Sequence, residues 1–268
     1  MPEVRGWSRR GWTAGGGGGG GGNGLLNNLV AYLAGNEESG NALDLHTNAL
    51  HLTDVNTVTS NPGWPGVYAN SRQYTAANNE YHTRPGDDAL LSTGDVDFTV
   101  AACFRTDNVN VGAGQPIFGK FDVANQREYL LFYNRNDHAP NQRFTFLVSS
   151  NGVATQRIDA NTFGAAANNT WYLVIGWHDA LNDLIGISVN DVPDTLAYAL
   201  GVFDSTARAT IGAIFNGGAP LATYYMDGRI GPTMFWKSAG GAGGVLTAAQ
   251  RTQLWNGGTP LKYTRFTV

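Results

Sequence analysis

Residues 171–178 read Trp171-Tyr172-Leu173-Val174-Ile175-Gly176-Trp177-His178, a run of aromatic and β-branched residues that fits a buried β-strand. Runs of this kind follow one another from residue 95 onward at intervals of about 10–15 residues, bounded by Gly, Asn and Asp. The others are residues 96–105, 116–121, 128–134, 143–149, 155–159, 184–190, 208–215 and 224–237. No helical pattern of crossover length separates them, and parallel strands need such crossovers. The sequence therefore predicts an antiparallel β-sandwich.

The remaining segments add one strand, one hairpin and one helix to this pattern. Residues 25–33 form an apolar segment that could be a first strand, and a turn-rich stretch follows to about residue 56. Ser-Ser-Asn-Gly at 149–152 indicates a hairpin, because Asn-Gly supplies the positive φ of such turns. Thr247 and Gln250 form a capping box at the start of a short C-terminal helix, which Asn-Gly-Gly at 256–258 should end. The chain is therefore expected to be all-β, with one helix.

Several segments resemble a known family in their order and spacing. They are ESGNALD at 38–44, LTDVNTV at 52–58, STGDVDFTV at 92–100, WYLVIGWH at 171–178, DGRIGP at 227–232, FWK at 235–237, LT at 246–247 and LWNGG at 254–258. Together they resemble the laminin-G-like branch of the concanavalin A-like lectin/glucanase superfamily, over roughly residues 25–263. The resemblance implies a two-sheet jelly roll that serves glycan binding, protein binding, oligomer display or glycoside cleavage. Fold alone does not choose among these functions.

The N-terminus lies outside this resemblance. A basic head, MPEVRGWSRRGWTA, is followed by the consecutive glycines 15–22, which separate it from the rest of the chain. We therefore divide the chain into an arm, residues 1–24, and a jelly-roll domain, residues 25–268. Arginine and tryptophan are enriched in interface hot spots, so the head is a candidate docking peptide. Its candidate anchoring residues are Arg5, Trp7, Arg9, Arg10 and Trp12. The alternatives are a flexible linker or a terminus without function.

Charge and composition exclude several classes of partner. The net charge is −4, and residues 1–14 hold three Arg against one Glu, which leaves 14 Lys and Arg against 20 Asp and Glu in the remainder. The negative net charge of this remainder argues against nucleic acid as a partner, because binding to nucleic acid requires a basic patch. No apolar stretch reaches the ~20 residues of a membrane span, and we expect no secretory signal peptide. The single cysteine, Cys103, lies in an apolar run and is expected to be a buried thiol without reactivity.

The sequence offers no set of catalytic residues. Retaining glycosidases need two carboxylates ~5–5.5 Å apart on one face, and residues i and i+2 of a strand share a face. Asp95 and Asp97 have that spacing but lie at a strand entry without a third acid, and Glu128 is the only glutamate after residue 80. The histidines show no metal-binding spacing, and there is no G-x-S-x-G elbow. We therefore predict a protein that is not an enzyme.

The resemblance implies one metal. Members of the superfamily often hold a structural Ca²⁺ where an Asp of the last strand meets oxygen ligands near the N-terminal strand. Asp227 matches the last-strand position, and Asp44 lies in an early loop that could face it. The alternative is that Asp227 caps a turn before Gly228.

Glycan binding would need aromatic rings and polar side chains on exposed loops. Trp64 lies between two prolines and is the tryptophan of the sandwich that we expect to be partly exposed, whereas Trp171, Trp177 and Trp236 have the pattern of core residues. The candidate glycan-binding residues are Trp64, Tyr68, Tyr74, Tyr81 and His138.

These observations predict a non-catalytic structural or display protein of a virion, such as a bacteriophage capsid decoration or tail component. In this hypothesis the arm anchors the chain, and the sandwich is exposed on a virion assembled in the host cytoplasm. The expected partners are other virion proteins, further copies of the chain and a surface glycan. The alternative is a free, extracellular carbohydrate-binding or adhesion module, and a third interpretation is a divergent glycosidase.

Overall fold

The computed structural model describes residues 22–110, 112–239 and 243–268. Within these ranges the chain forms two β-sheets and one α-helix, α1 (Ala248–Trp255). Three short 3₁₀ helices accompany them: η1 (Ala76–Asn78), η2 (Asn256–Gly258) and η3 (Tyr263–Arg265). The predicted all-β class with one short C-terminal helix is confirmed.

The first sheet has eight strands, ordered β13-β12-β11-β6-β17-β4-β3, with β1 also paired to β17. All of its strand pairs are antiparallel. The strands are β1 (Leu29–Leu33), β3 (Thr59–Pro62), β4 (Asn70–Tyr74), β6 (Phe98–Thr106), β11 (Trp171–Asp179), β12 (Leu184–Val189), β13 (Val192–Ala197) and β17 (Gly228–Lys237). The long central strands β6, β11 and β17 are buried along nearly their whole length, so both faces of this sheet are covered.

The second sheet has nine strands, ordered β10-β9-β8-β7-β14-β5-β2, with the β15–β16 hairpin attached to β7. Its pairs are antiparallel except for one parallel bridge between Phe215 and Asp122. The strands are β2 (Thr53–Val55), β5 (Tyr81–Thr83), β7 (Gln115–Asp122), β8 (Gln126–Asn134), β9 (Arg143–Val148), β10 (Gln156–Asp159), β14 (Ala209–Ile211), β15 (Ala213–Asn216) and β16 (Ala219–Tyr225).

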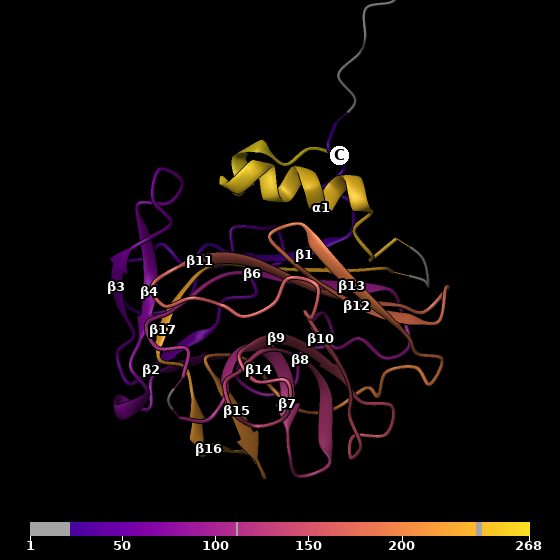
Figure 1. Cartoon of the computed structure of the whole chain (residues 1–268), viewed down its shortest axis with the longest axis horizontal. Coiled ribbons are helices and arrows are strands. Elements are labelled where there is room, and N and C mark those ends of the chain that lie inside the picture. The colour runs from indigo at the N-terminus through magenta and orange to yellow at the C-terminus, as the bar shows by residue number, and fades with distance from the viewer. Residues whose placement is uncertain (1–21, 111, 240–242) are drawn as a thin grey trace, which may run out of the picture.

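The main core lies between the two sheets. Phe98 and Phe235 of the first sheet meet Tyr129 of the second, and the Tyr129 and Phe235 rings stack with centroids 5.6 Å apart. Stacked and edge-on aromatic pairs fill such a layer densely and add to the energy of burial. Figure 1 shows the strongly curved second sheet on one side of this layer and β6, β11 and β17 on the other.

A second apolar layer covers the outer face of the first sheet. Helix α1 lies over this face (Figure 1), and its Leu254 is fully buried. Thr247 caps the helix, its side chain accepting from the Gln250 amide while the Gln250 side chain accepts from the Thr247 amide, so the predicted capping box is confirmed. Trp236 of β17 donates its indole N–H to the carbonyl of Leu25, 2.8 Å away. The two ends of the described chain are therefore both held on this face.

A buried polar cluster joins the two sheets at one edge. The imidazole of His82 on β5 hydrogen bonds the Tyr74 hydroxyl on β4 at 2.9 Å and the carbonyl of Gly40 at 3.1 Å. The guanidinium of Arg72, also on β4, lies 3.2 Å from His82 and donates to the carbonyls of Glu37 and Val58. Because β4 belongs to the first sheet and β5 to the second, these contacts cross the sandwich.

Each segment predicted as a strand contains one, but two of these segments each include parts of two strands. Residues 208–215 divide into β14 and β15 at Gly212, whose φ of +85° lies in the left-handed region. Residues 224–237 divide into the end of β16 and all of β17. The expected hairpin at 149–152 joins β9 to β10, and Gly152 has a positive φ of +77°.

Five strands were missed. Strands β2 to β5 fall mainly in or after the stretch interpreted as turn-rich, and β13 follows β12 through a tight turn. These segments are short or carry polar and proline residues on exposed positions, so alternation does not mark them. Their partners along the sheet edges stabilise them.

We expect His82 to make stability depend on pH. Burial lowers the pKa of His82 from 6.5 to about 4, with the nearby Arg72 charge adding to the effect. Between pH 4 and pH 6.5 this histidine binds more protons in the unfolded state than in the folded state. The free energy of unfolding is therefore highest above pH 6.5 and decreases as the pH falls to 4. The loss from this group should be about 3 kcal/mol in the free energy of unfolding.

Urea denaturation at pH 4 to 7.5 measures this loss. The variant His82→Gln keeps a hydrogen-bonding side chain but cannot titrate, so its stability should change less over the same interval. An equal pH dependence in both proteins would contradict the assignment.

Candidate functional site

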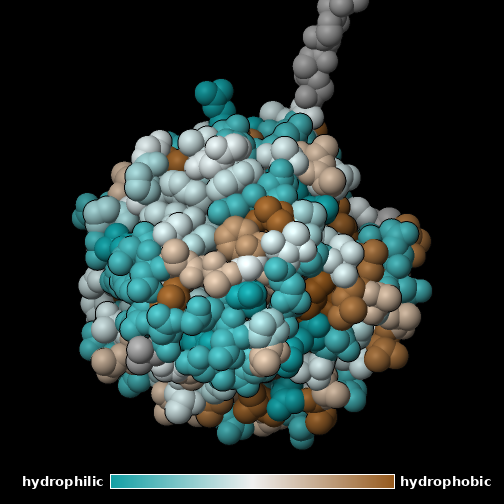
Figure 2. Space-filling model, in the orientation of Figure 1, coloured by the Kyte–Doolittle hydropathy of each residue, from teal (hydrophilic) through white to brown (hydrophobic). Residues whose placement is uncertain are grey.

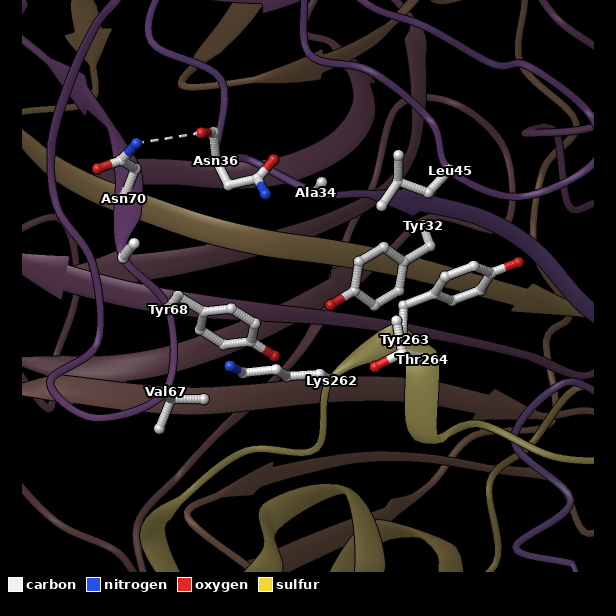
Figure 3. Close-up of a pocket in the computed structure, with 11 residues that line it drawn as sticks. Tyr32, Ala34, Asn36, Leu45, Val67, Tyr68, Asn70, Lys262, Tyr263 and Thr264 are labelled. Atoms are coloured by element: carbon white, nitrogen blue, oxygen red, sulfur yellow. Dashed lines mark hydrogen bonds between the residues drawn. The ribbon is translucent and has the colours of Figure 1, made fainter.

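A hollow of about 320 Å³ opens beside the C-terminal segment, at the end of β1. Four parts of the chain meet there: β1 with residues 34–36, Leu45 in the loop that follows, residues 67–70, and residues 262–264 at η3. We call it the tyrosine cleft, because three tyrosines lie among its lining residues (Figure 3). The lining residues are Tyr32, Ala34, Asn36, Leu45, Val67, Tyr68, Ala69, Asn70, Lys262, Tyr263 and Thr264.

The tyrosines take different positions in the cleft. Tyr32 forms the floor and is almost completely buried, with its ring 4.9 Å from Tyr263 and 5.7 Å from Phe266 between centroids. Tyr263 is half-buried and shares a hydrogen bond with His46 Nδ1 at 3.0 Å, which points its hydroxyl away from the cleft. This contact holds the Tyr263 ring at the side of the cleft.

Tyr68 forms the opposite side. The turn 64–68 places it, because the amides of Val67 and Tyr68 both donate to the carbonyl of Trp64. Its hydroxyl donates to the carbonyl of Leu261, 3.2 Å away. Figure 3 shows the Tyr68 and Tyr32 hydroxyls directed toward each other across the cleft. Burial raises the pKa of both phenols, so both remain neutral hydrogen-bonding groups at neutral pH.

Polar side chains surround these rings. Asn36 and Asn70 lie together on one side, with the Asn70 amide 3.5 Å from the Asn36 carbonyl oxygen. The Lys262 side chain extends along Tyr68 (Figure 3), and Thr264 is exposed at the edge. No Asp or Glu is among the lining residues. The cleft can therefore present aromatic surface and neutral or cationic donors to a ligand, but no carboxylate.

Large apolar side chains are exposed at few places in the described chain. Leu45, about half exposed, lies at the mouth of the cleft, whereas Leu181 and Leu200 lie elsewhere. Figure 2 shows brown surface only in separate areas among teal and white on the face that it displays. This face has no broad apolar surface of the kind that marks a large interface.

The expectation for Trp64 is wrong. Only 8% of its surface is exposed, because its ring stacks on Trp171 at 5.9 Å and meets Trp255 edge-on at 5.8 Å. Trp255 belongs to α1, so the helix covers the Trp64 ring. The two flanking prolines were the reason to expect this ring at the surface. Trp171, Trp177 and Trp236 are buried, as predicted.

Of the other candidate glycan residues, only Tyr68 lines this cleft. Tyr74 lies in β4 and Tyr81 in β5, so neither is a loop residue, and both are buried. Tyr74 hydrogen bonds His82, and Tyr81 packs edge-on against Phe215 at 5.8 Å. Their rings are therefore not available to stack on a sugar.

His138 lines a different hollow, on the outer face of the second sheet. That hollow, about 360 Å³, has an apolar floor that includes Phe121, Leu130 and Phe132. The His138 imidazole is 3.1 Å from the Asp159 carboxylate. The structure thus separates His138 from Tyr68 instead of bringing the two together.

For the two aspartates of the expected calcium site, the structure gives partners to the carboxylate of Asp44 and to the backbone of Asp227. Asp44 is buried, and its carboxylate accepts from the backbone amides of Tyr32, His46 and Leu50 at 2.8 to 2.9 Å. These bonds give Asp44 a structural role between β1 and its following loop. Asp227 precedes β17 and accepts through its backbone carbonyl from Gln115. Across the described residues no group of three His, Cys, Asp or Glu side chains could hold a metal ion.

The acids considered for catalysis also have structural partners. The Asp97 carboxylate accepts from the backbone amides of Ala180 and Gly243, while Asp95 is exposed. Glu128 is fully buried and lies 3.2 Å from the Lys120 ammonium. Burial raises the pKa of Glu128, although Lys120 acts in the opposite direction.

Cys103 is fully buried, and burial raises the pKa of its thiol, as expected for a cysteine without reactivity. In the ranges that the structure describes, no helix is long and apolar enough to cross a membrane. The anchoring candidates Arg5, Trp7, Arg9, Arg10 and Trp12 lie outside the described residues.

Comparison with known proteins identifies the fold and no family. No protein family matches the sequence, and no curated protein matches it. Domain 4 of AbnA, a GH43 extracellular arabinanase from Geobacillus stearothermophilus solved in complex with arabinotriose, has a TM-score of 0.58 at 16% identity. The match covers 84% of this chain and 96% of that domain.

Botulinum neurotoxin binding domains share the fold as well. The serotype C1 domain has a TM-score of 0.57 at 14% identity, over 85% of this chain and 52% of that one. The serotype DC domain in complex with SialylT has a TM-score of 0.56 at 14% identity, over 86% and 51%. The chain thus spans about half the length of these binding domains. At such identities the matches show a jelly-roll sandwich of lectin-like fold, and the laminin-G branch stays a prediction.

Most of the cleft could not be found from the sequence. Tyr263, Lys262, Asn36 and Asn70 belong to segments without a recognisable motif. They are brought together only because the C-terminal segment returns to lie beside β1. Tyr68 alone was marked beforehand, by its place in a proline- and glycine-rich loop.

We expect Trp64→Ala to destabilise the domain strongly. Removing a buried indole from between two rings leaves a cavity that the surrounding structure fills only in part, at a cost of about 3–5 kcal/mol. Guanidinium denaturation measures the change. Pro65→Ala, at the exposed neighbouring position, is the control and should change stability by less than about 1 kcal/mol. Similar stabilities for Trp64→Ala and the native protein would contradict the buried stack.

Proposed function

We propose that this domain binds a saccharide in the tyrosine cleft and does not cleave it. The observation that carries the proposal is the set of side chains that the fold gathers there: Tyr68 and Tyr263 on opposite sides, with the amides of Asn36 and Asn70 together at one side. A sugar ring has an apolar C–H face and a rim of hydroxyls. Aromatic rings match the first and amides the second.

The size of the cleft fits a short part of a saccharide. Its volume of about 320 Å³ is near the lower end of the ~300–1,000 Å³ found for ligand sites. The site is open on the surface, so a longer chain could continue beyond it. We therefore expect recognition of one or a few sugar residues within an oligosaccharide.

Absence of catalysis follows from the same set of residues. Hydrolysis of a glycosidic bond needs two carboxyl groups beside the bond, and no Asp or Glu lines the cleft. The carboxylate of Asp44, which follows β1 near the cleft, accepts from three backbone amides. These observations support a binding domain.

The structural neighbours support the same class of ligand. The arabinanase domain was solved with arabinotriose, and one botulinum binding domain was solved with SialylT. These ligands belong to those proteins. That this chain also binds a saccharide is our proposal, and it rests on the residues of the tyrosine cleft.

We further propose that residues 1–24 anchor the domain to a larger assembly, with a virion as the hypothesis. The support is the head with its Trp and Arg residues and the glycine tract after it. Asn23 hydrogen bonds Arg265 and Thr267, so the described end of this segment lies beside residues 265–267 and near Thr264 of the cleft. Other virion proteins and further copies of the chain are the proposed partners. The alternative is a free extracellular adhesion module.

We expect Tyr263→Ala and Tyr68→Ala each to weaken saccharide binding by roughly tenfold or more, because each removes one side of the cleft. A glycan array followed by calorimetry, with arabinotriose as the first defined probe, measures the affinity. Circular dichroism and thermal unfolding of each variant show whether it is folded.

His138→Ala is the matched control for this experiment, because it changes an aromatic side chain in the separate hollow on the second sheet. It should bind as the native domain does. Loss of binding in His138→Ala, with Tyr263→Ala unaffected, would move the site to the second sheet and overturn the assignment.

We expect a form that begins at Gly22 to fold normally but to lose its association with the larger assembly. The form keeps Asn23 and Gly24, which hydrogen bond the C-terminal residues and α1. Light scattering of both forms, alone and with phage particles, measures the assembly. Identical monomers that never co-sediment with particles would contradict an anchoring arm.

A further inference from the structure

A second hollow adjoins the tyrosine cleft. It has a volume of about 260 Å³ and is lined by Asn256 of η2, by the segment 259–265 that follows it and by residues 66–67. Val67 and Lys262 line both hollows, so the two meet at Lys262. Arg265, one turn further along η3, lines the second hollow. A ligand longer than one sugar ring could therefore pass Lys262 and reach Arg265.

The charge of this double hollow is opposite to that of the domain. Lys262 and Arg265 are the charged side chains among the residues that line the two hollows, and no Asp or Glu lines either. The domain beyond the head carries 14 Lys and Arg against 20 Asp and Glu. A cationic site in an acidic domain favours an anionic ligand at this place over the rest of the surface.

Among the described residues, the side chains of Lys262 and Arg265 have no protein partner, in contrast to the other Lys and Arg side chains of this part of the chain. The others contact carboxylates, carbonyls or aromatic rings: Arg72, Arg84, Arg105, Lys120, Arg127, Arg135, Arg143, Arg157, Arg208, Arg229, Lys237 and Arg251. No described residue hydrogen bonds or ion-pairs with the side chain of Lys262 or Arg265. Their donors are therefore available to a ligand without breaking a contact in the domain.

We propose that the tyrosine cleft and the adjoining hollow recognise an acidic saccharide, with a sugar carboxylate bound by Lys262 and Arg265. This inference rests on the proposed function and names its substrate class. A guanidinium can pair with a carboxylate through two parallel hydrogen bonds, and an ammonium acts as a point charge beside it. Tyr68 and Tyr263 contact the sugar ring, and the two cations select the charged group on that ring or the next.

The chemistry of the site favours an acidic sugar over other anions. Nucleic acid and anionic membranes require broad basic surfaces, whereas here two cations lie beside aromatic rings in a narrow hollow of an acidic domain. The adjacent asparagines suit hydroxyl groups. Uronic acids and sialic acids combine such hydroxyls with one carboxylate.

Matched pairs of probes test this preference: trigalacturonate against its methyl ester, and sialyllactose against lactose. Calorimetry at low and at high NaCl concentration should show the native domain binding at least one acidic probe tenfold or more tighter than its neutral counterpart. Salt should reduce this ratio, because the charges are exposed and are screened. The variant Lys262→Gln/Arg265→Gln should lose most of the ratio, because its affinity for the acidic probe should fall much more than its affinity for the neutral probe.

Arg157→Gln is the control variant, because it removes an exposed guanidinium from β10 on the other sheet. It should keep the preference of the native domain. Equal affinities for acidic and neutral probes, or an unchanged ratio in the double variant, would overturn the proposal. Preference for a sulfated disaccharide with none for the carboxylated probes would overturn the choice of carboxylate.

The result separates this inference from the proposed function. If neutral saccharides bind and Tyr263→Ala abolishes that binding, the cleft binds saccharides and only the acidic preference fails. If no acidic or neutral probe binds the native domain, both proposals fail. Loss of folding in the double variant, which removes two exposed side chains, is excluded by thermal unfolding of the same samples.

Discussion

The first sheet must be covered on both faces, and the rest of the structure depends on this constraint. Strands β6, β11 and β17 carry apolar side chains in both directions, so a two-layer sandwich would leave Trp177, Trp236 and Leu173 in water. The second sheet buries the inner face. The outer face is buried by α1, by the residues before β1 and by the C-terminal segment, which form a layer with its own apolar cluster. Burial of these large side chains stabilises the order of three layers.

The outer layer also creates the candidate site. Leu26 donates to the carbonyl of Thr267, and Trp236 donates to that of Leu25, so both ends of the domain are tied to β17. The C-terminal segment then runs past the end of β1, where Tyr263 packs on Tyr32. The 64–68 loop is held from the other side by Trp64 in its stack with Trp171 and Trp255. The cleft therefore lies between two segments that pack on the covered sheet, a placement that favours a pre-organised site.

Most charged side chains of the described residues contact other groups of the domain, whereas Lys262 and Arg265 do not. Lys120 with Glu128, and Arg72 with His82, are buried in clusters whose hydrogen bonds offset the cost of desolvation. Asp44 and Asp97 hold backbone amides of loops. The side chains of Lys262 and Arg265 have no such contact among the described residues, so they remain available for the ligand that we propose.

The sequence by itself determined the fold class, most of the sandwich strands from β6 onward but not β13, the hairpin at 149–152 and the cap of α1. These features depend on local alternation, turn residues and capping, which act over a few neighbouring residues. It also marked Tyr68, but it placed Trp64 at the surface and Tyr74 and Tyr81 in loops. Only the tertiary structure decided these positions, because the burial of a ring depends on which distant segment packs over it. Trp255 covers Trp64 from almost two hundred residues away. For the same reason the tyrosine cleft exists only in the folded chain, where residues near 32, 68 and 263 meet.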